Sequence, residues 1–128
     1  MERKIAKKKF KILMVCLGNI CRSPMAQGAM EFMAKKNSLS LIVDSAGTQN
    51  WHFNKSPDQR AQKVATSKGW KISYQKARQI LSSDFNNFDL IIGMDKSNIA
   101  DIVVLIAAEA IGSAPAFRIG FIIIIPIA

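Results

Sequence analysis

Short apolar runs alternate with amphipathic segments along most of the chain. Residues 12–15, 41–44 and 88–94 are apolar runs of the length and composition typical of buried strands. A further short strand is predicted within residues 72–80, and residues 117–124 can supply a last one. Residues 24–36 and 57–68 are predicted to be helices, because each begins with a proline and the second is followed by Gly69. Another helix is predicted from about residue 97.

This order of elements predicts the fold class. Strands that alternate with helices indicate an α/β fold, here a single three-layer domain with a central parallel sheet of about four strands and helices on both faces. On the first helix, Met25, Ala29, Phe32 and Met33 fall on one apolar stripe, which we expect to pack in the core. Ligands bind such sheets at the carboxyl ends of the strands, so the segment after residue 15 is the first candidate site.

That segment carries residues that can take part in a chemical reaction. It reads Cys16-Leu17-Gly18-Asn19-Ile20-Cys21-Arg22-Ser23. Backbone N–H groups in such a loop can form an anion nest, and the following helix N-terminus adds partial positive charge. Arg22 can hold two phosphate oxygens with its planar guanidinium group. The same electrostatic field favours a thiolate at Cys16, which can then attack phosphorus in line.

Two other loop residues fit this chemistry. Ser23 can donate a hydrogen bond to the Cys16 thiolate or to the departing sulfur, and Asn19 is a residue type that tolerates the unusual backbone of such a loop. A lone cysteine at a strand end is usually a small buried hydrophobic residue. The combination of an apolar strand, Cys, Gly, Asn, Arg, Ser-Pro and a helix favours the functional interpretation.

The segment from Val15 to Pro24 resembles the phosphate loop of the low-molecular-weight protein tyrosine phosphatases. Further similarities follow in the order of that family, at residues 44–48, 51–52, 56–61, 76–80 and 88–98. The resemblance spans about residues 10–101. It implies a protein tyrosine phosphatase that hydrolyses phosphotyrosine or aryl phosphate esters through a phosphocysteine intermediate and needs no metal or organic cofactor, because the loop supplies the positive charge.

The resemblance also assigns residues to roles. It implies catalytic roles for Cys16, Arg22 and Ser23. Asp95 follows the end of the strand predicted at residues 88–94 and so faces the ligand side, where we expect it to support the loop network. Substrate contacts are implied for the remaining loop residues and one tryptophan: Leu17, Gly18, Asn19, Ile20, Cys21 and Trp51. Two interpretations of Cys21 stay open, a reversible disulfide with Cys16 under oxidation and a thiol that fills space.

The sequence departs from the family after Asp101. The general acid of the family is an aspartate in a later Asp-Pro-aromatic loop, and no aspartate follows Asp101, so the general acid is unassigned. Residues 102–128 hold only Glu109 and Arg118 as charged residues. We therefore expect a phosphatase domain over residues 11–128 that is truncated or atypical after 101. Gln75 stands where the family often has histidine.

Charge and composition set the remaining expectations. The net charge is +9, and 6 of the 18 Lys and Arg residues lie in residues 1–11. We expect residues 1–10 to form a basic, solvated and partly disordered arm, with attraction to an acidic partner or membrane surface as the alternative. The single histidine, His52, makes no metal site, and no aromatic residues interleave the basic cluster, which disfavours nucleic acid.

The sequence predicts a cytoplasmic monomer with no membrane span. Its expected ligands are a phosphotyrosine protein or small aryl phosphate, and a phosphate or sulfate ion in the loop. One alternative is an arsenate reductase of the same fold, but no further cysteine follows Cys21 to relay a disulfide. The other is a phosphate-binding pseudo-phosphatase, which the missing general acid supports and the intact Cys16, Arg22 and Ser23 oppose.

Overall fold

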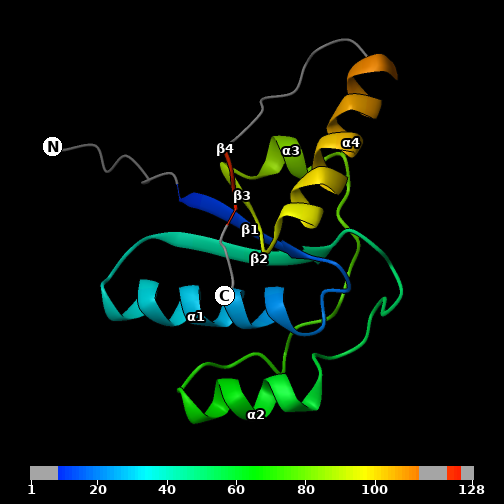
Figure 1. The fold of residues 1–128 in the computed structure, drawn as a ribbon. Coiled ribbons are helices and arrows are strands. Elements are labelled where there is room, and N and C mark those ends of the chain that lie inside the picture. Colours follow the sequence, from blue (N-terminus) through cyan, green and yellow to red (C-terminus); the bar gives the residue numbers. More distant parts are fainter. Residues whose placement is uncertain (1–8, 113–120, 125–128) are drawn as a thin grey trace, which may run out of the picture.

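A computed structural model describes residues 9–112 and 121–124, with side chains as far as residue 108. The helices and strands follow in the order β1 (Phe10–Cys16), α1 (Arg22–Lys36), β2 (Leu41–Gly47), α2 (Gln59–Ser67), α3 (Asp84–Asn87), β3 (Leu90–Gly93), α4 (Lys96–Gly112) and β4 (Phe121–Ile124) (Figure 1). Each strand is parallel to its neighbours, in the sheet order β2-β1-β3-β4. The predicted α/β domain with a parallel sheet is confirmed.

Strand β1 lies between β2 and β3, which explains its apolar sequence. All residues from Ile12 to Cys16 are buried, as expected of a strand that is covered on both faces. In the register of the sheet, Cys16 lies opposite Gly47 of β2, and Val15 lies opposite Gly93 of β3. The carboxyl ends of three strands therefore meet at one edge, where residues 16–23, called the candidate loop below, begin.

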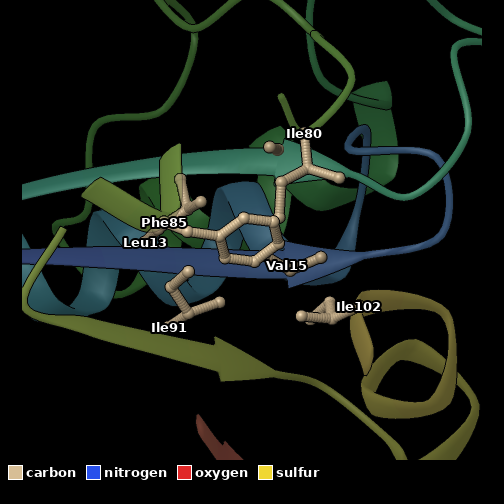
Figure 2. Close-up of a cluster of buried hydrophobic side chains, with 7 residues drawn as sticks. Leu13, Val15, Ile80, Phe85, Ile91 and Ile102 are labelled. Atoms are coloured by element: carbon tan, nitrogen blue, oxygen red, sulfur yellow. The ribbon is translucent and has the colours of Figure 1, made fainter. Parts of the chain in front are cut away.

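Side chains alternate between two apolar layers, one on each face of the sheet. The first layer meets α3 and α4 and consists of Leu13, Val15, Ala46, Ile80, Phe85, Ile91 and Ile102 (Figure 2). The second contains Ile12, Met14, Cys16, Val43, Ile92 and Met94, with Ala26 and Met30 of α1 packed against it. Helices thus cover both faces, and α2 packs on α1 through Ala61 and Ala65 rather than on the sheet (Figure 1).

Two expectations from the sequence are wrong. Residues 72–80 form no strand, only an isolated bridge between Gly47 and Gln79. Their backbone groups pair with a loop instead, since Ala77 N–H donates to the Lys55 carbonyl. On α1, Phe32 and Met33 are 39% and 48% exposed. The helix buries a different face, because the amide of Gln27 bonds to strand β2 and turns that side of the helix inward.

Some expectations fall largely on residues that the structure does not describe. Arg118 and the basic arm lie outside the described ranges, apart from Lys9 and Phe10 of the arm. The strand expected within residues 117–124 corresponds to β4 at Phe121–Ile124. Among the described residues, no helix combines the length and the apolar character that crossing a bilayer requires.

The packing of α4 on the sheet can be tested with two neighbouring residues of this helix. Ile102 is 0% exposed and Val103 is 51% exposed. Ile102→Ala should lower the free energy of unfolding by about 2–5 kcal/mol, because it leaves a cavity in the first apolar layer. Val103→Ala should change it by less than about 0.5 kcal/mol. Urea unfolding followed by circular dichroism measures both values, and equal effects would contradict the described packing of α4.

Candidate functional site

The candidate loop joins the end of β1 to the start of α1. Cys16, the last residue of β1, is 3% exposed. Asn19 adopts a left-handed backbone with φ of 58°, which asparagine tolerates better than most residues. In this conformation its backbone N–H donates to Cys16 Sγ at 3.3 Å. The loop therefore bends back around the sulfur, as the sequence predicted from the residue types.

The side chain of Asn19 ties this bend to the rest of the domain. It is 2% exposed. Its Nδ2 donates to Ser23 Oγ at 2.8 Å and to Ser45 Oγ at 3.0 Å, and its Oδ1 accepts from the backbone N–H of Arg78 at 3.0 Å. Both N–H groups of the amide are thus used, and its oxygen is satisfied as well. The contacts link the loop to α1, to β2 and to the segment before α3.

Ser23 lies beside the sulfur. Its Oγ is 3.0 Å from Cys16 Sγ, and the residue is fully buried. Since Ser23 Oγ already accepts from Asn19, its own proton remains available for the sulfur. Ser23 is thus within hydrogen-bond distance of the sulfur, and its role as donor stays a prediction.

Neutral polar side chains lie behind Asn19 and Ser23 and form hydrogen bonds with one another. Ser45 Oγ donates to Gln27 Oε1 at 2.7 Å, and lies 3.4 Å from Gln75 Oε1. Gln75 Nε2 donates to the Pro24 carbonyl at 3.1 Å, so Gln75 braces the first turn of α1. Gln27 Nε2 donates to the Tyr74 hydroxyl, which in turn donates to Glu31. Burial, followed by the bond to Glu31, raises the pKa of Tyr74, so this hydroxyl stays protonated.

Arg22, the first residue of α1, pairs with Asp95 beyond the end of β3. Arg22 Nη1 is 2.6 Å from Asp95 Oδ2. The other carboxylate oxygen of Asp95 accepts from Ser97 Oγ at 2.7 Å and from the Asn98 backbone N–H at 2.8 Å. The hydrogen bond from Arg22 is the main cause that lowers the pKa of Asp95 to about 2. Asp95 thus holds Arg22 at the sheet edge and also secures the start of α4.

The loop after β2 forms backbone hydrogen bonds with the candidate loop. Backbone N–H groups of Thr48 and Gln49 donate to the carbonyls of Cys16 and Leu17 at 2.9 and 3.0 Å. A Cβ atom on Gly47 would lie 2.7 Å from the Leu17 carbonyl oxygen, so only glycine permits this approach. These bonds direct the carbonyls of the loop away from the sulfur.

Apolar side chains on the candidate loop and on the loop after β2 are exposed or half-buried. Leu17 is 36% exposed, Trp51 is 64% exposed and Ile20 is half-buried. Phe53, which the sequence analysis did not single out, is 68% exposed in the same loop as Trp51. His52 lies close to Gly18, where an added Cβ would be 2.9 Å from His52 Cδ2.

Cys21 differs from Cys16 in its surroundings. Both cysteines are free, but Cys21 is exposed whereas Cys16 is buried. Partial burial, with a smaller contribution from Asp58, raises the pKa of Cys21. Cys21 therefore holds its proton more firmly than an ordinary cysteine does.

Sequence reasoning missed the contribution of Arg78. Its guanidinium donates to Asp84 at 2.9 Å and to Asp44 at 3.1 Å, while its backbone N–H reaches Asn19. These ion pairs fix the backbone on which the Asn19 oxygen depends. The sequence signal for this role is Arg78 within Lys76-Ala77-Arg78-Gln79-Ile80, one of the segments that resemble the family.

The described residues contain no group of three or more His, Cys, Asp or Glu side chains that could hold a metal ion. The polar groups gathered at this edge of the sheet include Cys16, Arg22, Ser23 and the Asn19 backbone N–H. These groups can hold an anion beside a sulfur nucleophile.

Comparison with known proteins agrees with this geometry. Residues 11–114 match the family model described as low molecular weight phosphotyrosine protein phosphatase. A phosphatase of that name from Saccharomyces cerevisiae is 42% identical over 98 residues, which cover 74% of this chain and 60% of the relative. The chain thus spans about three fifths of the length of such relatives.

Solved structures share the fold. A protein tyrosine phosphatase from Entamoeba histolytica, with Hepes in its active site, aligns with a TM-score of 0.72 and 41% identity, over 75% of this chain and 62% of that one. A Drosophila arginine phosphatase aligns with a TM-score of 0.81 and 32% identity, over 89% of this chain and 70% of that one. Because the family model covers most of the sequence and the loop geometry is present, the chain belongs to the low molecular weight phosphotyrosine protein phosphatases.

Proposed function

We propose that this chain hydrolyses phosphotyrosine or aryl phosphate esters through a phosphocysteine on Cys16. One observation carries the proposal: a buried sulfur at the end of β1 lies between the Asn19 backbone N–H, at 3.3 Å, and the Ser23 hydroxyl, at 3.0 Å. Both groups stabilise a sulfur that carries negative charge. Arg22 stands at the start of α1, where the helix N-terminus also attracts anions.

The proposed reaction has two steps. The Cys16 thiolate attacks phosphorus, a sulfur–phosphorus bond forms, and the bond from phosphorus to the aryl oxygen breaks. Arg22 and the loop N–H groups stabilise the equatorial oxygens of the transition state. Water then attacks phosphorus, so that an oxygen–phosphorus bond forms and the sulfur–phosphorus bond breaks. Inorganic phosphate retains the protons of the water, and the sulfur leaves as a thiolate with a hydrogen bond from Ser23. Asp95 keeps the guanidinium of Arg22 in place through both steps.

A phenol of low pKa can leave without the help of a general acid. A phenolate of low pKa departs unprotonated, whereas tyrosine requires a proton in the transition state. The donor of that proton stays unassigned, since no aspartate follows Asp101 in the sequence. An activated aryl phosphate is therefore the appropriate first substrate for this chain.

An aromatic ester suits the rim of the site better than an aliphatic one. Leu17 and Ile20 of the candidate loop are apolar and at least partly exposed, as are Trp51 and Phe53 of the loop after β2. Aromatic rings favour such surroundings through burial and offset stacking.

We also propose a monomer in a reducing, cytoplasmic setting, which two free cysteines on one loop support.

Exchange of the nucleophile tests the proposal directly. Cys16→Ser should lower the rate of p-nitrophenyl phosphate hydrolysis by at least about 10³-fold, because the hydroxyl of serine is a far weaker nucleophile than a thiolate. Cys21→Ser is the matched control, and it should retain activity within about threefold. Rapid quenching followed by intact mass spectrometry should show one phosphoryl group on the wild type and none on Cys16→Ser. Equal activity of the wild type and Cys16→Ser, or no hydrolysis by the wild type, would refute the proposal.

The ion pair between Arg22 and Asp95 predicts a dependence of stability on acid. The pKa of Asp95 is about 2 in the folded chain and about 3.9 when unfolded. Its contribution is thus fully present above about pH 4 and is lost as the pH falls through about 2. The difference in unfolding free energy between wild type and Asp95→Asn should be constant near neutral pH and should shrink below about pH 4.

Asp101→Asn, at an exposed carboxylate of α4, provides the control for this measurement. Urea unfolding at a series of pH values gives the free energies of all three proteins. The control should follow the wild type throughout. A difference between wild type and Asp95→Asn that stays constant down to pH 2 would contradict the ion pair.

A further inference from the structure

A hollow of about 560 Å³ lies between α1 and the segment that follows α2. Residues of α1 form one side, and residues 69–74 form the other. None of the lining residues belongs to the loop from Cys16 to Arg22 or to the loop after β2. The volume lies within the range of sites that bind small molecules. This hollow is therefore separate from the site proposed for catalysis.

Aromatic rings and glycines shape the hollow. Phe32 and Tyr74 both line it and are 39% and 57% exposed. A Cβ atom on Gly28 would lie 2.5 Å from Ile72 Cγ2, so glycine lets the second segment approach the helix closely. Gly69 has a φ of +81°, and a Cβ there would lie 3.4 Å from the Phe32 ring. Two ring surfaces and two glycines therefore contribute to the walls of the hollow.

The ring of Tyr74 is fixed before any ligand arrives. Its hydroxyl donates to Glu31 and accepts from Gln27 Nε2 at 3.3 Å. Gln27 is itself buried and bonded to the Val43 carbonyl at 3.1 Å. A wall that is already ordered loses little conformational entropy when a ligand binds.

The charges around the hollow are mostly positive. Lys35, Lys36 and Lys71 line it and are exposed. In the part of the chain that the structure describes, none of them forms a salt bridge with a carboxylate. Glu31 is the one acidic residue of the lining, and its carboxylate already accepts from Tyr74. Lysines without carboxylate partners next to ring surfaces complement an anion that carries an aromatic group.

We propose that this hollow binds a small aromatic anion of the aryl carboxylate class. Its ring would lie against Phe32 and Tyr74, and its carboxylate would meet Lys35 and Lys71. A neutral aromatic compound would leave the lysines unused. An aliphatic anion would not stack on the two rings. The proposal does not depend on catalysis, because no residue of the hollow takes part in the proposed reaction.

Binding of 2-naphthoate, measured by isothermal titration calorimetry, tests this site. The double variant Lys35→Glu/Lys71→Glu should weaken binding at least about 10-fold, because both cations become anions. Lys63→Glu is the matched control, since Lys63 is an exposed lysine of α2 outside the hollow. It should bind as the wild type does. Phe32→Ala should also weaken binding, and the uncharged 2-naphthamide should bind at least about 10-fold more weakly than 2-naphthoate.

Other outcomes would overturn the proposal. Absence of 2-naphthoate binding to the wild type would do so, as would equal affinity in the double variant. Arg22→Ala should leave the affinity unchanged, and loss of binding there would place the ligand in the catalytic loop instead. Capture of an acidic aromatic peptide without binding of 2-naphthoate would assign the hollow to a protein partner. Circular dichroism of each variant confirms that it is folded.

Discussion

The candidate site depends on the hydrogen bonds that hold Asn19 in its left-handed conformation. Such a backbone costs about 1–2 kcal/mol for a residue with a side chain. Three side-chain hydrogen bonds, each worth about 1 kcal/mol net, offset that cost. Their partners are Ser23, Ser45 and Arg78, which come from three separate parts of the chain. The conformation therefore exists only when α1, β2 and the segment before α3 are assembled.

The parallel sheet makes this assembly possible. Cys16 ends β1, Ser45 lies near the end of β2, and Asp95 follows β3, so that the carboxyl edge of the sheet gathers all three. Asp95 then positions Arg22, and Ser45 positions Asn19. The Cys16 sulfur, the carboxylate that pairs with Arg22 and the hydroxyl that binds Asn19 thus come from the ends of neighbouring strands. The buried network around Ser45 is neutral, which avoids the desolvation cost of charges beneath the loop.

The sequence predicted the local parts of this arrangement well. Cys16, Arg22 and Ser23 lie within one strand–loop–helix unit, so residue type and spacing were sufficient to predict that they share one loop, and their catalytic roles stay predictions. The predicted supporting position of Asp95 agrees with its ion pair to Arg22. The long-range contacts could not be predicted from local sequence, because the hydrogen bond from Arg78 to Asn19 joins residues 59 positions apart. The domain limits at residues 11–128 and the basic arm stay predictions.

The errors have a common physical origin. Residues 72–80 were expected to contain a strand from their local composition, but their polar groups are used to bind the loops around the site. Phe32 and Met33 were expected in the core. The buried face of α1 instead carries Ser23 and Gln27, whose side chains form hydrogen bonds with the loop and with β2. A buried polar face cannot be recognised from apolar periodicity. The exposed ring of Phe32 in turn lines the hollow between α1 and residues 69–74.

The most direct test of the account is phosphate binding by Asn19→Gly. Glycine keeps the left-handed backbone accessible and removes only the side-chain hydrogen bonds. Asn54→Gly is the control, because Asn54 is also left-handed, with φ of 64°, and is exposed. The inhibition constant of inorganic phosphate against p-nitrophenyl phosphate should rise at least about 10-fold in Asn19→Gly and stay unchanged in Asn54→Gly. An unchanged constant in Asn19→Gly would show that the loop holds its shape without this side chain, and would contradict the account.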